Sequence, residues 1–199
     1  MNLISCAAAC AFVSAAMVVA PPALGQQDKA PSTKKAAAKG GLSKADAKFL
    51  RDMGEADLAE VEAGKLASGK ASSPEVKKFA EHMVEDHGKG LSEGQKLAKG
   101  KGVEPPAAPA KKHQAAMKKL ESESGARFDK AYMNQMVKDH QETLKLVENA
   151  SKKAKDGEIR AAAEKKVPVV KQHLEMAQKT TASLKDDSSN SDGRKKAKK

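Results

Sequence analysis

The sequence predicts an all-α protein whose long helices pack into a bundle. Apolar residues recur at helical spacing, about every 3.6 positions, through each long segment between residues 43 and 184, and no segment alternates at a period of two. The chain contains no tryptophan, one tyrosine and four phenylalanines, so leucine, valine, methionine and alanine must fill its core. Such a core suits closely approaching helices better than it suits a β-sandwich.

The segment 1–25 is predicted to be a signal peptide that is removed on export. It contains no charged side chain, and its apolar run from Ala7 to Ala20 is shorter than the ~20 residues that a membrane span needs. Small residues precede Gln26, as signal-peptidase cleavage requires. Both cysteines fall within this segment, so the mature protein is expected to have no disulfide and no thiolate metal ligand. We therefore expect a periplasmic or secreted protein.

Lysine-rich segments flank the predicted helical domain, which spans residues 43–184. Residues 26–42 and 185–199 carry much of the net charge of +11 and almost no large apolar side chain, so we expect both to be disordered. A solubilising role is the plainer interpretation of these basic flanks, and contact with acidic envelope polymers or anionic lipid is the alternative. No aromatic residue is interleaved with their lysines, which argues against specific nucleic-acid binding.

The first helix is expected to begin after Ser43, a favourable N-cap, and to run to about Leu66. At 100° per residue, most of its apolar side chains fall on one stripe. Glu60 lies within that stripe, whereas Glu55 and Glu62 lie outside it. The stripe contains Phe49, Met53, Ala56 and Ala63.

The second helix has a clear start, with Ser73 as N-cap, Pro74 at the first helical position and Glu75 favourable to the helix dipole. His87 lies near the centre of its apolar face, and His82 points elsewhere. Proline and glycine residues between 99 and 112 forbid any continuation of this helix. The apolar face contains Val76, Ala80, Met83 and Leu91.

A short helix is expected at about residues 111–123, and a third long helix from about Ala126 to Lys155. Asp129 and His140 lie within the broad apolar face of this long helix. The other members of the face are Phe128, Tyr132, Met136, Thr143, Val147 and Ala154.

Asp156 and Gly157 predict a turn, after which the fourth long helix is expected to run to about Leu184. His173 lies on its apolar stripe. Pro168 removes a backbone donor and is expected to kink the helix one turn before this histidine. The stripe also contains Ile159, Ala163, Val170, Leu174 and Ala177.

Each long helix therefore places a residue that can bind a metal ion on its apolar face. Burying such groups costs free energy unless each finds a partner, so we expect them to converge or to pair. The four residues are Glu60, His87, His140 and His173, with Asp129 as a fifth candidate. Asp129, Tyr132, Met83 and Met136 would stand behind the ligands of such a site.

A five-residue pattern occurs twice, as MVEDH at residues 83–87 and as MVKDH at residues 136–140. Repetition of methionine, aspartate and histidine together suggests a site, whereas repeated apolar residues at helical spacing indicate only two similar helices. We interpret the pattern as two helices facing each other across a polar centre, with metal ligation as the second interpretation. Asp86 and Asp139 would then be solvated or would pair with lysines.

Four blocks of the sequence resemble, in order, a bacterial secreted family catalogued as domain of unknown function 4142. The blocks are FLRDMGEADLAEVEAGKLA, SSPEVKKFAEHMVEDH, GARFDKAYMNQMVKDH and VPVVKQHLEMA. This resemblance covers about residues 44–182 and implies a ferritin-like four-helix bundle, here with the short extra helix before the third long one. It implies no established activity. The family's recurring positions fall on Glu60, Asp86, His87, Phe128, Asp129, Tyr132, His140, Pro168 and His173.

The inward histidines do not match the di-iron motif of ferritin-like proteins, in which Glu-x-x-His occurs on two helices. A valine stands three residues before each of them, so oxygen-activating di-iron chemistry is not expected. Three imidazoles and one carboxylate would instead suit zinc, or copper with an open position. The methionine one turn before two of the histidines favours copper in its reduced form.

The favoured interpretation is a non-enzymatic helical-bundle binding module, associated with the envelope or with stress by analogy alone. The inward histidines would then belong to a structural network of hydrogen bonds. The alternative is a metal-binding protein that uses Glu60, His87, His140 and His173 to hold copper or zinc, with iron less favoured. No serine stands beside an inward histidine and no glycine-rich phosphate loop occurs, so no catalytic residue is predicted.

Overall fold

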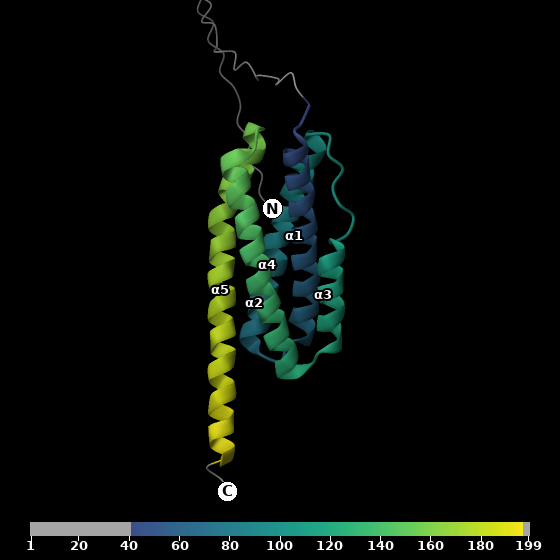
Figure 1. Ribbon diagram of the computed structural model, residues 1–199. Helices are drawn as coiled ribbons and strands as arrows, with labels where there is room; N and C mark the ends of the chain where they lie inside the picture. Colours follow the sequence, from purple (N-terminus) through teal and green to yellow (C-terminus); the bar gives the residue numbers. More distant parts are fainter. Residues whose placement is uncertain (1–40, 197–199) are drawn as a thin grey trace, which may run out of the picture. The chain divides into compact units, whose positions relative to one another are not determined.

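The structure is a computed structural model that describes residues 41–196, with side chains described as far as Lys185 (Figure 1). This part of the chain forms five α-helices and contains no strand. The all-α bundle that the sequence predicts is confirmed, including the short helix before the third long one. The helices are α1 (Lys44–Lys70), α2 (Pro74–Gly100), α3 (Lys111–Ser122), α4 (Gly125–Lys153) and α5 (Gly157–Lys196).

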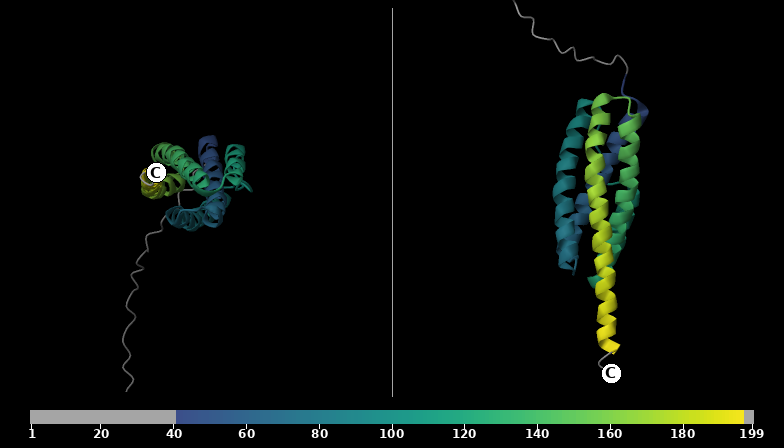
Figure 2. Two further views of the ribbon diagram at one scale, coloured as in Figure 1. Left: turned by 90° about the horizontal axis from the view of Figure 1, so that it is seen from below. Right: turned by 90° about the vertical axis from the view of Figure 1, so that its left-hand side faces the viewer.

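The four long helices form two antiparallel hairpins, α1 with α2 and α4 with α5. The hairpins meet where α1 packs on α4 and where α2 packs, over a shorter stretch, on α5. Between the hairpins the chain crosses back along the bundle, and α3 lies on the outside against α1 and α4 (Figures 1 and 2). Because of this crossover, α2 and α4 run in the same direction, as in ferritin-like folds with one long connection.

Polar side chains cap the first turn of three long helices, α1, α2 and α5. The hydroxyl of Ser43 accepts a hydrogen bond of 3.0 Å from a first-turn amide of α1, and Ser73 precedes α2, both as the sequence predicts. Asp156 caps α5, because its Oδ1 accepts hydrogen bonds from the amides of Glu158 and Ile159 at 2.9 and 3.1 Å.

Asp46, which the sequence did not single out, ties the start of α1 to the turn between α4 and α5. Its buried carboxylate accepts hydrogen bonds from the backbone amides of Lys155 and Asp156, at 3.1 and 3.0 Å. These bonds fix the position of the second hairpin along the bundle axis relative to the first. They therefore help to determine which inward residues of different helices meet.

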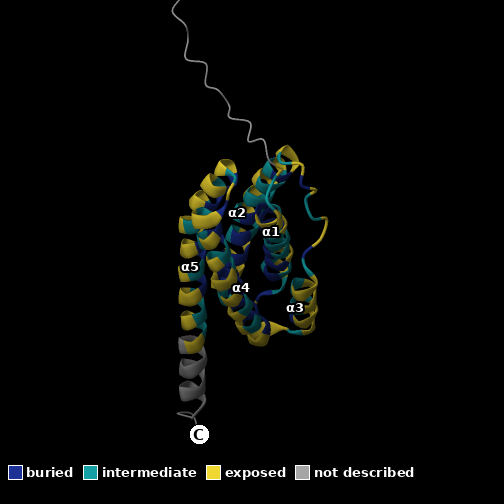
Figure 3. Ribbon diagram, turned by 45° about the horizontal axis from the view of Figure 1, so that its top comes forward, coloured by how far each residue is buried: buried dark blue, intermediate teal, exposed yellow. Residues whose placement is uncertain are grey.

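The core is divided into two apolar halves, and the buried faces of the helices line both (Figure 3). One half surrounds the α1–α2 turn and contains Phe79, Met83, Phe128, Tyr132, Met136 and smaller side chains. The other surrounds the α4–α5 turn and contains Phe49, Leu50, Met53, Val147, Ile159, Val170 and smaller side chains. Between them, at one height in all four long helices, lies a polar layer of Asp57, Glu60, His87, His140 and His173.

Small side chains let the helices of the first hairpin approach closely, as the composition predicts. A Cβ atom on Gly64 of α1 would lie 2.7 Å from Cγ2 of Val84 and 3.0 Å from the carbonyl oxygen of Ala80, both on α2. This position therefore requires glycine for steric reasons, although glycine disfavours a helix interior.

The last helix differs from its prediction in length. It passes Pro168 as one continuous helix and continues to Lys196, well beyond the expected end at residue 184 (Figure 1). Pro168 has no amide hydrogen for the carbonyl group of Glu164, four residues earlier. Both residues are exposed, so water can bind that carbonyl. The expected signal peptide at 1–25 and nearly all of the expected linker at 26–42 lie outside the described residues. Among the helices described, none has the length and apolar character that crossing a membrane requires.

Candidate metal centre

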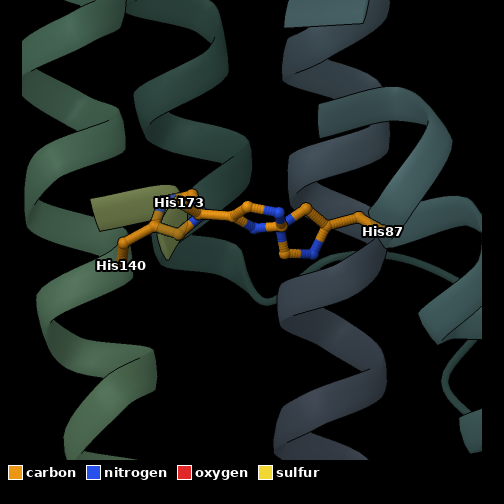
Figure 4. A group of neighbouring side chains, drawn as sticks. All are labelled: His87, His140 and His173. Atoms are coloured by element: carbon orange, nitrogen blue, oxygen red, sulfur yellow. The ribbon is translucent and has the colours of Figure 1, made fainter. Parts of the chain in front are cut away.

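Three histidines from three helices converge in the polar layer (Figure 4). His87 comes from α2, His140 from α4 and His173 from α5, and all three are buried. Their ring centroids are 5.2–5.5 Å apart in every pair. One ring nitrogen of each histidine lies within 4.8 Å of a ring nitrogen of the other two. We call these residues the histidine triad.

Each ring of the triad is held from behind by a hydrogen bond to one of its nitrogens. Nδ1 of His87 lies 2.9 Å from Oδ1 of Asp57, and Nδ1 of His140 lies 2.8 Å from the carbonyl oxygen of Met136. Nε2 of His173 lies 3.1 Å from Oδ2 of Asp86. All three partners are acceptors, so the ring nitrogen that faces each of them must carry the hydrogen.

The second nitrogen of each ring has no hydrogen-bond partner. These buried atoms are Nε2 of His87, Nε2 of His140 and Nδ1 of His173. A neutral imidazole that donates from one nitrogen carries a lone pair on the other, so in the neutral form each of these atoms is an acceptor without a donor. An unpaired buried acceptor costs about 1–3 kcal/mol, which makes this arrangement unfavourable unless something occupies the centre.

Burial favours the neutral form of two triad members, His140 and His173. It lowers the pKa of His140 to about 3, and the neighbouring His87 contributes in the same direction. The same two causes lower the pKa of His173 to about 4, against the opposing effect of its hydrogen bond to Asp86. At neutral pH these two rings therefore present lone pairs, which is the form that binds a metal ion.

Asp57 is a buried member of the layer that the sequence analysis missed. Only 2% exposed, its carboxylate contacts His87 through Oδ1 and lies 3.2 Å from Nζ of Lys166 through Oδ2. The lysine reaches it across Gly90, where an added Cβ would lie 2.8 Å from Nζ. A signal was available, because residue 57 is at helical spacing from both Met53 and Glu60.

Glu60 lies beside the triad and not within it. Its Oε1 is 3.8 Å from Nδ1 of His140, the nitrogen already directed at a carbonyl oxygen, and its buried Oε2 has no partner. Burial raises the pKa of Glu60 well above its ordinary value, and the negative charges of Asp139 and Asp57 add to this effect. Both causes favour the protonated acid. The hydroxyl of Tyr132 is also buried without a partner, and burial together with Glu60 raises its pKa.

Of three other residues expected near the site, Asp129 lies away from the triad, whereas Met83 and Met136 lie next to it. Asp129 lies at the α1–α2 turn, where its carboxylate accepts hydrogen bonds from the amides of Ser72 and Ser73 at 2.9 and 2.8 Å. Met83 and Met136 belong to the apolar half next to the layer, one helical turn from their histidines.

The two aspartates of the repeated pattern, Asp86 and Asp139, were expected to be solvated or to pair with lysines. Each instead lies beside a histidine. Asp86 is the hydrogen-bond partner of His173, and Nε2 of His82 lies 3.4 Å from the same carboxylate oxygen. Asp139 is buried, accepts a hydrogen bond of 2.8 Å from Gln135 and lies 3.8 Å from His113 of α3. Each aspartate therefore contacts a histidine of a neighbouring helix, or lies close to one.

A cavity of about 620 Å³ between α1, α2 and α5 reaches the layer from one side. Most of its lining is apolar. The layer contributes Asp57, His87 and His173 to the lining, and Asp86, whose carboxylate holds His173, also lies there. The triad is thus buried within the bundle but lies next to a space that a small ligand can enter.

The comparisons with known proteins agree with this architecture. The family model described as domain of unknown function, DUF4142, matches residues 31–180. The chain belongs to the DUF4142 family. No curated protein matches this DUF4142 chain.

Solved structures similar to this DUF4142 chain share its fold at low sequence identity. A DUF305 protein from Streptomyces coelicolor is 17% identical with a TM-score of 0.61, over 70% of this chain and 93% of that one. A DUF305 fragment from Deinococcus radiodurans is 10% identical with a TM-score of 0.64, over 72% and 99%. CopM in its Cu(II)-bound form is 18% identical with a TM-score of 0.59, over 69% and 96%. At these identities the similarity shows a common helical fold.

Proposed function

We propose that this DUF4142 protein binds one copper ion through His87, His140 and His173. The observation that carries the proposal is the set of three unpartnered imidazole nitrogens within one layer. Each ring is oriented from behind by a hydrogen bond to its other nitrogen, which is how protein metal sites hold their histidine ligands. A cation would supply the electron-pair acceptor that all three nitrogens lack.

The donor set favours copper over other ions. Three imidazole nitrogens suit late transition metals, and the affinity of a nitrogen site for divalent ions is highest for copper. The solved structure of CopM, a neighbour in fold, contains Cu(II), which supports the same choice. Asp57 and Asp86 behind two of the rings would balance the charge of the ion, as would ionisation of Glu60.

The role that follows is to hold or carry copper, with no catalytic step. The apolar leader expected at residues 1–25 supports export, so the ion would be bound in the periplasm or outside the cell. The sequence predicted Glu60 as a fourth ligand, and we propose instead that it adjusts the charge beside the ion. Its Oε1 lies 3.8 Å from Nδ1 of His140, the nitrogen that is hydrogen-bonded to Met136 and not the one offered to the ion.

The test is copper binding by the mature chain and by single histidine variants. Wild-type protein, freed of metal, should bind one equivalent of Cu(I) or Cu(II) in competition with a chelator of known affinity. His87→Ala, His140→Ala and His173→Ala should each weaken binding by about 100-fold or more, since loss of a group that only holds a ligand in place already costs 10–100-fold. His113→Ala is the matched control, because His113 lies outside the triad and should leave the affinity unchanged.

A structural polar layer is the second candidate function of these residues. It is favoured by the fact that each histidine already makes one hydrogen bond to the protein. If the wild-type protein binds no copper, or if all three triad variants bind it as well as wild type does, the copper proposal is wrong and the layer serves folding alone.

A further inference from the structure

A second set of ligand atoms lies where the polar layer reaches the surface. His82, Asp86 and His173 each offer one atom, and these atoms lie within 4.8 Å of one another. Oδ2 of Asp86 is 3.4 Å from Nε2 of His82 and 3.1 Å from Nε2 of His173. Two ligands at ~2.0–2.1 Å from a tetrahedral ion are roughly 3.3 Å apart, so these spacings already fit one ion. We call this set the outer cluster.

The outer cluster is open to solvent, unlike the triad. The side chains of His82 and Asp86 are 39% and 29% exposed, whereas that of His140 is 1% exposed. His82 and Asp86 are four residues apart on α2 and therefore lie on the same face of that helix.

His173 belongs to both sets. Its Nε2 faces Asp86 in the outer cluster, and its Nδ1 is the unpartnered nitrogen that it contributes to the triad. The rings of His82 and His173 lie 5.5 Å apart, and those of His173 and His140 lie 5.4 Å apart. A neutral imidazole has only one lone pair, so His173 can bind an ion on one side or the other but not on both.

We propose that the outer cluster is the entry site for copper and that His173 transfers the ion from it to the triad. This inference rests on the proposed function. In the outer position His173 binds through Nε2 and carries its hydrogen on Nδ1. In the inner position it binds through Nδ1, and the hydrogen sits on Nε2, where Asp86 accepts it. The ion keeps its charge and oxidation state, and the net change is one proton moved between the two nitrogens of one ring.

The geometry explains why such an entry site is useful. The triad is buried, so an ion cannot reach it from solvent without first passing the side chains that cover it. His82 and Asp86 would replace part of the ion's bound water at the surface, and His173 then needs no large movement to present its other nitrogen.

His82→Ala tests the transfer with little risk to the fold, because His82 is partly exposed. Copper uptake by metal-free protein is followed in a stopped-flow instrument through quenching of Tyr132, the single tyrosine of a chain without tryptophan. We expect uptake to slow by roughly tenfold or more, because loss of even a group that only orients a ligand weakens metal binding 10–100-fold, and here a ligand itself is lost. The amount bound at equilibrium should stay at one ion, and His113→Ala should take up copper at the wild-type rate.

His140→Ala tests the outer cluster without the triad. This variant should still bind one Cu(II), more weakly, with an electron paramagnetic resonance spectrum that shows imidazole nitrogen ligands. Adding His82→Ala to it should remove that signal. Asp86→Asn should slow uptake as His82→Ala does, because it removes the carboxylate ligand of the outer cluster.

The outcomes separate the two proposals. If wild-type protein binds no copper, both fail. If wild type binds copper through the triad but His82→Ala loads at the wild-type rate, or if His140→Ala shows no residual site, the entry site is overturned and the triad stands.

Discussion

At the scale of single residues, the polar layer is an arrangement that stability alone does not favour. His140 is 1% exposed and has one hydrogen bond, from Nδ1 to the carbonyl oxygen of Met136, while its Nε2 has none. That carbonyl also belongs to the ladder of α4, so it does not depend on the histidine. The unpaired Nε2 lowers the stability of the metal-free protein, and in return the ring is already positioned to bind an ion.

His140→Leu should therefore separate stability from binding. An apolar side chain of similar size removes the unpaired nitrogen, so the free energy of unfolding of the metal-free protein should rise or should fall by no more than about 1 kcal/mol. High-affinity copper binding should be lost. Met136→Leu, one turn away, is the control that keeps the triad and should retain copper. A loss above about 3 kcal/mol in His140→Leu would instead identify the ring as a structural element.

At the scale of the helices, sequence periodicity predicted which side chains point into the bundle, but not how far along the bundle axis each of them lies. The spacing of apolar residues determines which way a side chain points around its helix, and this placed Glu60, His87, His140 and His173 on inward faces. It does not determine how far along the bundle each one lies. Asp129 also points inward, but it lies at the level of the α1–α2 turn and binds Ser72 and Ser73.

Height depends on helix starts, turn lengths and tertiary contacts such as that of Asp46 with Lys155, which no local pattern contains. For the same reason the partners behind the rings were not foreseen. Asp57 and Asp86 contact histidines from other helices, across sequence separations that only the assembled bundle brings together.

The close contact of α1 with α2 gives a prediction with a control in the same helix. Gly64→Ala should reduce the free energy of unfolding by about 1–3 kcal/mol, because its Cβ would press on Val84 and on the backbone of α2. Gly69→Ala, whose Cβ would meet nothing within 4 Å, should raise stability by roughly 0.5–1 kcal/mol. Urea denaturation measures both. Equal effects at the two positions would contradict the packing described for the hairpin.

The cap of α5 gives the expected dependence of stability on pH. Asp156→Ala should cost about 0.5–2 kcal/mol at pH 7 through loss of the amide hydrogen bonds. The hydrogen bond from Lys101 lowers the pKa of Asp156, so its contribution is complete above the ordinary carboxyl pKa of about 3.9 and disappears as pH falls through the lower, folded-state value. The difference between wild type and variant in urea midpoints should therefore shrink at acidic pH, and a constant difference would argue against the cap.

At the scale of the whole molecule, the triad joins the two hairpins. His87 belongs to the first, and His140 and His173 belong to the second, while the direct contact of α2 with α5 is short. An ion bound by all three would act as a cross-link at the middle of the bundle, between its two apolar halves.

Copper should accordingly stabilise both hairpins together. At a free concentration about 100 times the dissociation constant, it should add about 2.7 kcal/mol to the free energy of unfolding. Amide hydrogen exchange should slow in α2, α4 and α5 alike, and a chelator should reverse the effect. Slower exchange confined to α2 would indicate binding at His82 and Asp86 without the triad.

The crossover also bears on the ancestry of the repeated pattern. MVEDH belongs to the second helix of its hairpin and MVKDH to the first helix of the other. Duplication of a whole hairpin would have left the two copies in equivalent places, both first or both second. Because α2 and α4 run in the same direction, the two stretches instead pass through the layer with the same polarity. The two stretches are alike because both cross the polar layer in the same direction and so need the same residue types there. Duplication of a hairpin does not account for their similarity.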